Sequence, residues 1–337
     1  MKHDTTPSTS VQARLARCVR GAMRPAWHTA QWLLKITVPV SLAVLLLKTS
    51  GALEILARWT EPIFSIFGLP GEAALVFTTA ALLNNYSAIV VMGTLGLTGR
   101  AITILALMCL ISHNLPVETA VQRKVGSSAI WILIARLACS VVGGIALNAL
   151  LPADAVAVAA VDTDVIPLAA GFRTELTTWL IDTAWLCGKI LVLVTTLMVL
   201  QRVLEEFGVT RFLGRIMKWP LVLLGVPQSA AFLWIVANTL GLAYGAGIII
   251  DHVESGKLSR RDADLLNYHI AISHSLLEDT FLFAAIGAAV GWITVPRVLL
   301  AGAVVWIKRL VAASVNKTPT RTDVNEREYK TLGTRED

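Results

Sequence analysis

Long apolar runs alternate with short polar stretches along most of the chain. Windows such as 38–47, 102–111, 190–200 and 230–250 contain no ionised side chain. A soluble helix of that length would keep one polar face, whereas a helix in lipid or in the core of a membrane bundle does not need one. The pattern therefore predicts an all-α fold, a polytopic transmembrane bundle rather than a soluble enzyme.

The apolar runs and their breakers predict about ten membrane segments. The clear segments are 32–49, 72–92, 101–115, 127–151, 178–202, 229–250, 265–290 and 291–311. Two weaker segments, 52–68 and 210–226, carry several charged residues. They fit short spans, re-entrant pieces or interfacial helices equally well.

Composition supports the membrane interpretation. Apolar residues make up 55% of the 337 residues and charged residues 15%, against roughly 45–50% and about 25% in soluble domains. The net charge of +6 comes from Lys and Arg in the tails and short loops, where the positive-inside rule places them. We therefore expect no nucleic-acid partner. The four cysteines show no metal-site or disulfide spacing.

An internal repeat is the most informative feature of the sequence. Ser112-His113-Asn114-Leu115 aligns with Ser273-His274-Ser275-Leu276 at an offset of 273 − 112 = 161 residues. At the same offset Arg136 aligns with Arg297. Matching arginines inside apolar helices rarely arise by chance, so the chain is predicted to contain two copies of one helical unit.

Charge predicts the orientation of the two copies. An Arg-rich tail, 1–30, precedes the first copy, 31–151, and an acidic loop, 152–177, separates it from the second copy, 178–312. A polar tail, 313–337, is expected to be disordered. The positive-inside rule places both termini in the cytoplasm and the loop outside. Each copy then crosses the inner membrane an odd number of times, so the second is inverted, as in many secondary transporters.

Polar residues inside apolar helices are costly unless they are paired or hydrated, so they are the candidate site residues. The first group contains Asn84, Asn85 and Tyr86, with Asn238 and Tyr244 in the second copy. Adjacent carboxamides suit a polar ligand or a local opening of the helix. Hydrogen bonding between helices is an equally good structural explanation.

The second group surrounds the repeated histidines. Its candidate substrate-binding residues are Ser112, His113, Asn114 and Glu118 in the first copy, and Ser273, His274, Glu278 and Asp279 in the second. Pro116 interrupts the first copy, and helices interrupted at corresponding positions of two repeats indicate a transport site. A histidine beside a carboxylate relays a proton, holds a metal or binds a hydroxylated solute, and the spacing leaves these options open. A brace within each copy is the structural alternative.

Arg136 and Arg297 are expected to form ion pairs with these carboxylates or to bind an anion. The spacing of His269, His274 and Glu278 does not fit a helical metal site, because the histidines are five positions apart instead of four and no H-E-x-x-H motif occurs. Nucleotide-binding loops and hydrolase elbows are also missing. We therefore expect that the protein is not an enzyme and that it has no catalytic residue, no cofactor and no resident metal.

Short motifs that occur in both copies resemble a known domain. They are the Gly-[Leu/Val]-Pro turns at 68–70 and 225–227, and the I-S-H-[N/S]-L segments at 111–115 and 272–276, each followed by an acidic residue and a threonine. Together with the polar mid-membrane helix they resemble the nucleoside-recognition or Gate domain. That domain occurs in the spore maturation A and B proteins, in ferrous iron transport B proteins and in distant concentrative nucleoside transporters. The resemblance covers about residues 35–310 and implies a transport-related membrane protein.

We expect a permease for a small polar solute, either nucleoside-like, an organic anion or an ion. Alternating access between the two inverted repeats, coupled to a proton or cation, is the expected mechanism, with His113 and His274 as relays. The alternatives are a non-transporting assembly factor of the spore-maturation type and a divalent metal permease. The expected partners are the lipid bilayer, the solute and a coupling proton or cation, with a homo-oligomer or a second membrane subunit left open.

Overall fold

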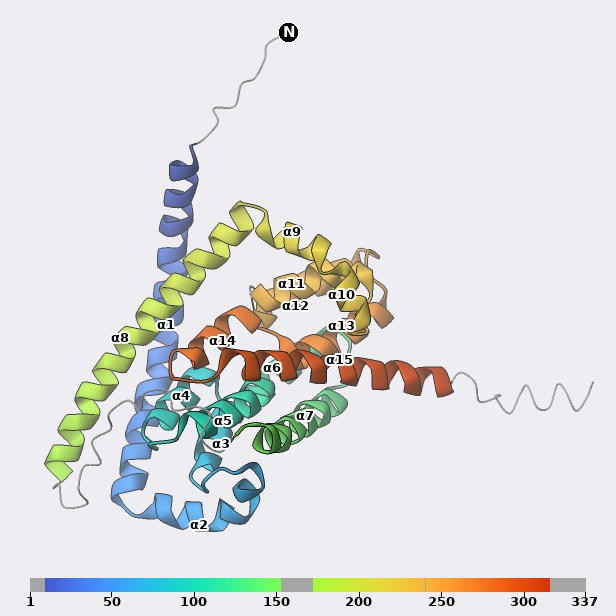
Figure 1. Ribbon diagram of the computed structural model, residues 1–337. Coiled ribbons are helices and arrows are strands. Elements are labelled where there is room, and N and C mark those ends of the chain that lie inside the picture. The colour runs from blue at the N-terminus through green and yellow to red at the C-terminus, as the bar shows by residue number, and fades with distance from the viewer. Residues whose placement is uncertain (1–9, 153–171, 240, 316–337) are drawn as a thin grey trace, which may run out of the picture.

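The computed structural model describes residues 10–152, 172–239 and 241–315, and this part of the chain is helical with no strand (Figure 1). The first half contains α1 (Val11–Thr49), α2 (Ala52–Phe64), η1 (Ser65–Phe67), α3 (Ala73–Leu82), α4 (Asn85–Gly93), α5 (Gly99–Ser112), α6 (Leu115–Lys124) and α7 (Ala129–Leu150). The second half contains α8 (Phe172–Glu206), α9 (Val209–Ile216), α10 (Lys218–Leu223), η2 (Gln228–Ala230), α11 (Ala231–Thr239), α12 (Leu242–Glu254), α13 (Arg260–Ser273), α14 (Leu276–Ala284) and α15 (Val290–Val315). The predicted all-α class is confirmed.

Five helical stretches of the described chain are long and apolar enough to cross a bilayer. They are Val11–Thr49, Gly99–Lys124, Ala129–Leu150, Arg173–Glu206 and Val290–Ser314. The chain is therefore a multi-pass membrane protein. The other predicted segments consist of shorter helices.

Three segments that the apolar pattern predicted as continuous are broken. The 72–92 segment divides between α3 and α4, the 229–250 segment between α11 and α12, and the 265–290 segment between α13 and α14. At the first break the side chain of Asn84 accepts a hydrogen bond of 2.9 Å from the backbone N–H of Ser87. Asn84 is thus an N-cap and starts a helix instead of continuing one.

The breaks after α5 and α13 have the same construction. Asn114 and Ser275, which follow the two histidines, have left-handed φ angles of 49° and 53°, a conformation uncommon outside glycine. Asn114 donates its backbone N–H to the carbonyl of Ala80 at 2.8 Å, and Ser275 donates to that of Ala237 at 3.3 Å. Each break is therefore fixed against α3 or α11, and α6 and α14 begin there.

The first helix is longer than predicted. The sequence placed it at 32–49 after a tail at 1–30, but α1 begins at Val11. Arg14 donates from Nε to Oε1 of Glu206 at 2.9 Å, at the end of α8. This ion pair holds the basic first turns of α1 against the end of α8. Residues near Arg14 in the sequence do not indicate this contact.

The predicted loop and C-terminal tail fall mostly outside the described residues. Residues 153–171 and 316–337 are not described. Of the predicted loop at 152–177, the last part is helical, because α8 begins at Phe172.

The α2 segment is too short to span a bilayer as a helix. Its 13 residues extend for roughly 20 Å at about 1.5 Å per residue, against about 30 Å of hydrocarbon core. Ile55, Trp59 and Ile63 are exposed on it. An amphipathic helix of this kind suits a membrane interface.

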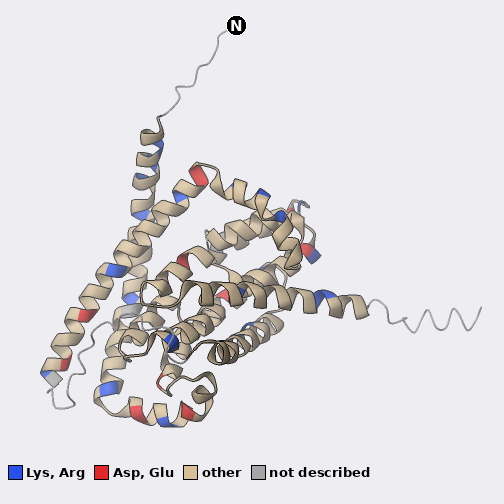
Figure 2. Cartoon of the chain, in the orientation of Figure 1, with Lys and Arg blue, Asp and Glu red and all other residues tan. Residues whose placement is uncertain are grey.

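The long helices α1 and α8 lie side by side, and the other helices form a body beside them (Figure 1). The start of α1 meets the end of α8 through Arg14 and Glu206, so the two helices are antiparallel. Consequently α2 and α9, which follow them directly, lie at opposite ends of the pair (Figure 1). Charged residues gather on these four helices and on the loops, while the helices of the body are mostly uncharged (Figure 2).

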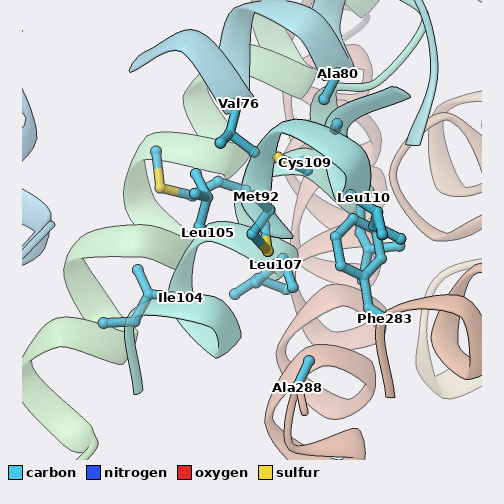
Figure 3. Close-up of a cluster of buried hydrophobic side chains, with 14 of the residues drawn as sticks. Val76, Ala80, Met92, Ile104, Leu105, Leu107, Cys109, Leu110, Phe283 and Ala288 are labelled. Carbon is cyan, nitrogen blue, oxygen red and sulfur yellow. The ribbon is translucent and has the colours of Figure 1, made fainter. Parts of the chain in front are cut away.

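The main apolar core joins both halves of the chain. Side chains of α5 pack against α3 and α4, and also against α14 and the turn after it, as Figure 3 shows. The labelled members are Val76, Ala80, Met92, Ile104, Leu105, Leu107, Cys109, Leu110, Phe283 and Ala288. Because one cluster contains residues of both halves, the halves pack as one body.

Gly71 fixes the approach of α3 to α2. A Cβ at this position would overlap the carbonyl oxygen of Ala57. Thr60 donates from Oγ1 to the Gly71 carbonyl at 2.7 Å, and Oε2 of Glu61 accepts from the Gly71 N–H at 2.6 Å. The polar residues of the 52–68 segment thus have a structural role.

We predict that Gly71→Ala lowers the free energy of unfolding by about 1–3 kcal/mol, because the added methyl group overpacks a backbone contact. The melting temperature of the detergent-purified protein measures the effect. Gly188→Ala is the control, since no atom lies within 4 Å of a Cβ there, and it should leave the melting temperature unchanged or raise it. Equal losses in the two variants would contradict the packing explanation.

Candidate functional site

The two histidines of the repeat face each other in the buried interior. Nε2 of His113 lies 3.2 Å from Nε2 of His274, and the ring centroids are 4.9 Å apart. On the other edge of each ring, Nδ1 of His113 lies 3.1 Å from the Leu110 carbonyl, and Nδ1 of His274 lies 2.8 Å from the Ile270 carbonyl. A carbonyl oxygen only accepts, which assigns a hydrogen to each Nδ1. In the neutral form both Nε2 atoms therefore point lone pairs at each other.

Two carboxylates approach these histidines from the helices that begin after the breaks. Oε1 of Glu118 lies 3.1 Å from both Nε2 atoms, and its Oε2 lies 2.7 Å from Nη1 of Arg136. Asp279 is the repeat equivalent of Glu118, since 279 − 118 = 161, and its Oδ2 lies 3.6 Å from Nε2 of His113. Each carboxylate thus approaches the histidine of the other copy.

The two arginines hold the ends of the broken helices. Arg136 is fully buried and donates from Nε to the Ile111 carbonyl and from Nη2 to the His113 carbonyl, both at 2.7 Å. Arg297, equally buried, donates from Nη2 to the His274 carbonyl. The last carbonyls of a helix lack intrahelical partners. Each arginine therefore donates hydrogen bonds to backbone carbonyls at the break in its own copy.

The copies differ in how the arginine meets a carboxylate. Glu118 reaches Arg136, whereas Asp279, with a side chain shorter by one methylene, forms no ion pair with Arg297 among the described residues. Nε and Nη1 of Arg297 and Oδ2 of Asp279 have no hydrogen-bond partner in that part of the chain. Unpaired buried polar atoms cost about 1–3 kcal/mol each. They mark a place where water or a ligand would be stabilised.

Tyr86 extends the cluster toward α4. Its hydroxyl donates to Oε1 of Glu278 at 2.7 Å, which links α4 of the first copy to α14 of the second. The adjacent Asn85 is buried, and neither its amide oxygen nor its amide nitrogen has a protein partner among the described residues. The predicted polar segment therefore reaches the same interface as the histidines.

The remaining predicted site residues have local hydrogen bonds. Ser112 donates to the carbonyl of Arg136 at 3.3 Å, Ser273 to that of His269 at 3.0 Å, and Asn238 to that of Trp234 at 2.9 Å. These contacts brace helices. The side chain of Tyr244 lies outside the described residues.

Gln122 is a buried polar residue that our sequence analysis missed. It lies four residues after Glu118 in α6, is fully buried, and has no hydrogen-bond partner for either side-chain amide atom in the described chain. Its backbone carbonyl accepts from the side chain of Asn267 at 2.9 Å. Residues four apart lie on one helix face, so this spacing was the available signal.

The structure also assembles a set of possible metal ligands that the spacing did not indicate. The spacing of His269 and His274 along the sequence predicts no metal site. In the structure, ligand atoms of His113, Glu118 and His274 all lie within 4.8 Å of one another. His269 instead accepts a hydrogen bond at Nδ1 from Nε1 of Trp234 at 3.0 Å.

The fold and this site define a multi-pass α-helical membrane protein with a buried ionisable cluster between two helix breaks. The chain is 30% identical over 285 residues to the protein titled "Uncharacterized membrane protein YvoD" of Bacillus subtilis (strain 168), and the match covers 82% of this chain and 88% of that protein. The chain belongs to the same family. No family model and no solved structure matches it. The membrane class is thus confirmed, and the resemblance to the Gate domain stays a prediction.

We predict that Glu118→Gln lowers the free energy of unfolding by about 3–5 kcal/mol, because it leaves the buried Arg136 guanidinium without its counter-charge. The matched control is Glu206→Gln, which removes the half-exposed ion pair with Arg14. Solvent screens that pair, so its loss should change the melting temperature little. Chemical or thermal unfolding in detergent measures both variants, and equal effects would argue against a buried charge pair.

Proposed function

We propose that this chain is a permease for a small polar solute, and that its substrate site lies between the two copies around His113 and His274. One observation carries the proposal: the breaks of α5 and α13 meet at one buried cluster, in which Glu118 lies 3.1 Å from a histidine of each copy. Discontinuous helices at corresponding positions of two repeats form the substrate sites of secondary transporters. Ionisable residues inside membrane bundles usually serve such a pathway.

Reciprocal contacts support an inverted arrangement of the copies. The N–H of Ala289 donates to Oγ1 of Thr103 at 3.1 Å, and Oγ of Ser127 donates to Oδ1 of Asp264 at 2.6 Å. Thr103 and Asp264 are equivalent at the offset of 161, and 289 − 161 = 128 is adjacent to Ser127. A two-fold relation produces each contact twice. The first helices of the two copies, α1 and α8, are antiparallel, as a two-fold relation between inverted copies requires.

Buried polar atoms without protein partners support a polar solute. In the described chain they include side-chain atoms of Asn85, Ser87, Thr119, Gln122 and Thr280. In a membrane bundle such atoms are tolerated where they line a hydrated or solute-filled space. The resemblance to Gate domains points the same way. We propose no enzymatic role.

Labelling of equivalent cysteines tests the inversion. In the first part of each copy the offset is 157 residues, at which Gly68 aligns with Gly225 and Pro70 with Pro227. Arg58 and Arg215 are equivalent at this offset, since 215 − 58 = 157, and both are exposed. In a chain whose native cysteines are replaced, we predict that Arg58→Cys reacts with a membrane-impermeant maleimide from one side of the membrane and Arg215→Cys from the other. With both termini in the cytoplasm, Arg215→Cys faces the cytoplasm. Labelling of both from the same side excludes inverted repeats.

Uptake by proteoliposomes tests transport directly. A thermal-shift screen with nucleosides, organic anions and divalent cations selects the solute, and its uptake is then measured. We predict that exchanging both His113 and His274 for Gln reduces uptake at least about tenfold, because the cluster loses both imidazole rings that contact Glu118. His252→Gln, in α12 and outside the cluster, is the control. A stable protein partner on purification, without any solute-dependent shift or flux, would favour the assembly-factor alternative.

A further inference from the structure

We propose that His113, Glu118 and His274 bind a first-row divalent transition-metal cation, such as Zn²⁺, Fe²⁺ or Mn²⁺. The inference names the occupant of the site in the proposed function and rests on that function for the role of the ion. Binding itself is measured without transport, so the two claims are tested separately.

Three potential metal-ligand atoms lie close together in the buried cluster. Nε2 of His113, Nε2 of His274 and Oε1 of Glu118 are separated by 3.2, 3.1 and 3.1 Å. Both Nδ1 atoms are committed as donors to backbone carbonyls. Three acceptors at these distances repel one another unless they share a positive charge. A single hydrogen makes one good hydrogen bond, whereas a metal ion contacts all three atoms at once.

The triangle has the size of one face of a tetrahedral metal site. Metal–ligand bonds of about 2.0–2.1 Å in a tetrahedron place ligand atoms about 3.3 Å apart. The observed separations of 3.1–3.2 Å differ from this by about 0.2 Å, within ordinary side-chain movement. Binding therefore needs little rearrangement of the helices.

Outer contacts fix each ligand as they do in known metal sites. A metal-bound histidine usually donates its second ring N–H to a carbonyl or carboxylate, and a bound carboxylate is itself held. Here the carbonyls of Leu110 and Ile270 accept from the histidines, and Arg136 holds Oε2 of Glu118 at 2.7 Å. All three side chains of the triangle are buried. The site is thus oriented before an ion binds.

The ligand types select the class of cation. Two imidazoles and one carboxylate suit Zn²⁺, Fe²⁺ and Mn²⁺, whereas Mg²⁺ and Ca²⁺ prefer oxygen ligands alone. No cysteine belongs to the group, which disfavours soft cations such as Cu⁺. Three ligands leave a fourth position open. Oδ2 of Asp279, 3.6 Å from Nε2 of His113, is an additional carboxylate oxygen that this geometry offers as a fourth ligand.

Zinc titration of the full-length, detergent-purified and chelator-treated protein tests the proposal. We expect one Zn²⁺ per chain, measured by calorimetry or competition with a metal indicator. His113→Gln and His274→Gln should each weaken binding at least about tenfold, since losing even an outer contact costs 10–100-fold. His252→Gln is the matched control, because its Nδ1 also lies 2.9 Å from a carbonyl, that of Ile248, but the residue is outside the triangle. It should bind zinc as the unmodified protein does.

X-ray absorption at the zinc edge of the unmodified protein adds a test that needs no variant. It should show two imidazole ligands and one oxygen ligand at about 2.0–2.1 Å. Absence of stoichiometric zinc in protein with a normal melting curve overturns the proposal, and so does undiminished binding when both histidines are replaced. Zinc binding without any flux supports this inference and counts against the permease, whereas solute flux without zinc binding does the reverse.

Discussion

The ion pair between Arg136 and Glu118 determines where the Glu118 carboxylate lies in the buried histidine cluster. A guanidinium stays charged when buried, so its carboxylate partner cannot move away without a large cost. Glu118 is therefore held at 2.7 Å from Arg136, and in that position its other oxygen touches both histidines at 3.1 Å. The same arginine donates to carbonyls at the end of α5. One buried charge pair thus connects the helix break, the start of α6 and the histidine of the other copy.

The second copy repeats this construction with a shorter carboxylate. Arg297 also supports the break beside its histidine, but Asp279 does not reach it among the described residues. The first copy therefore has an arginine–carboxylate ion pair of 2.7 Å, and the second has none among the described residues. The shorter side chain of Asp279 is the chemical source of the difference.

Local signals in the sequence predicted the features that depend on neighbouring residues. Pro116 predicted the interruption after His113 in the first copy, and the arginines predicted a partner among the carboxylates, which is where Arg136 is found. The segment 72–92 was predicted as one span, with a local opening at Asn84 and Asn85 as one option, and the structure shows that opening, where Asn84 caps a new helix. The length of α1 was missed because its basic turns are supported by Glu206, far away in the sequence.

The histidine pair shows why the metal ligands were not predicted. Spacing arguments compare residues within one helix, and His113 and His274 are 161 residues apart. Only the packing of the two halves of the chain brings them together. Similarly, the Arg and Glu residues of 52–68 left several interpretations open, whereas the structure shows a helix too short to span.

The contact between Glu118 and His274 joins the two halves of the chain at the buried cluster. A double-mutant cycle measures it directly, using the free energy of unfolding of Glu118→Gln, His274→Gln and the double variant in one detergent. Residues in contact within one network show coupling energies of about 0.5–3 kcal/mol. We expect a coupling of at least about 1 kcal/mol for this pair, given its 3.1 Å separation and burial. Effects that add within about 0.5 kcal/mol would contradict the shared cluster and the arrangement of the two copies built on it.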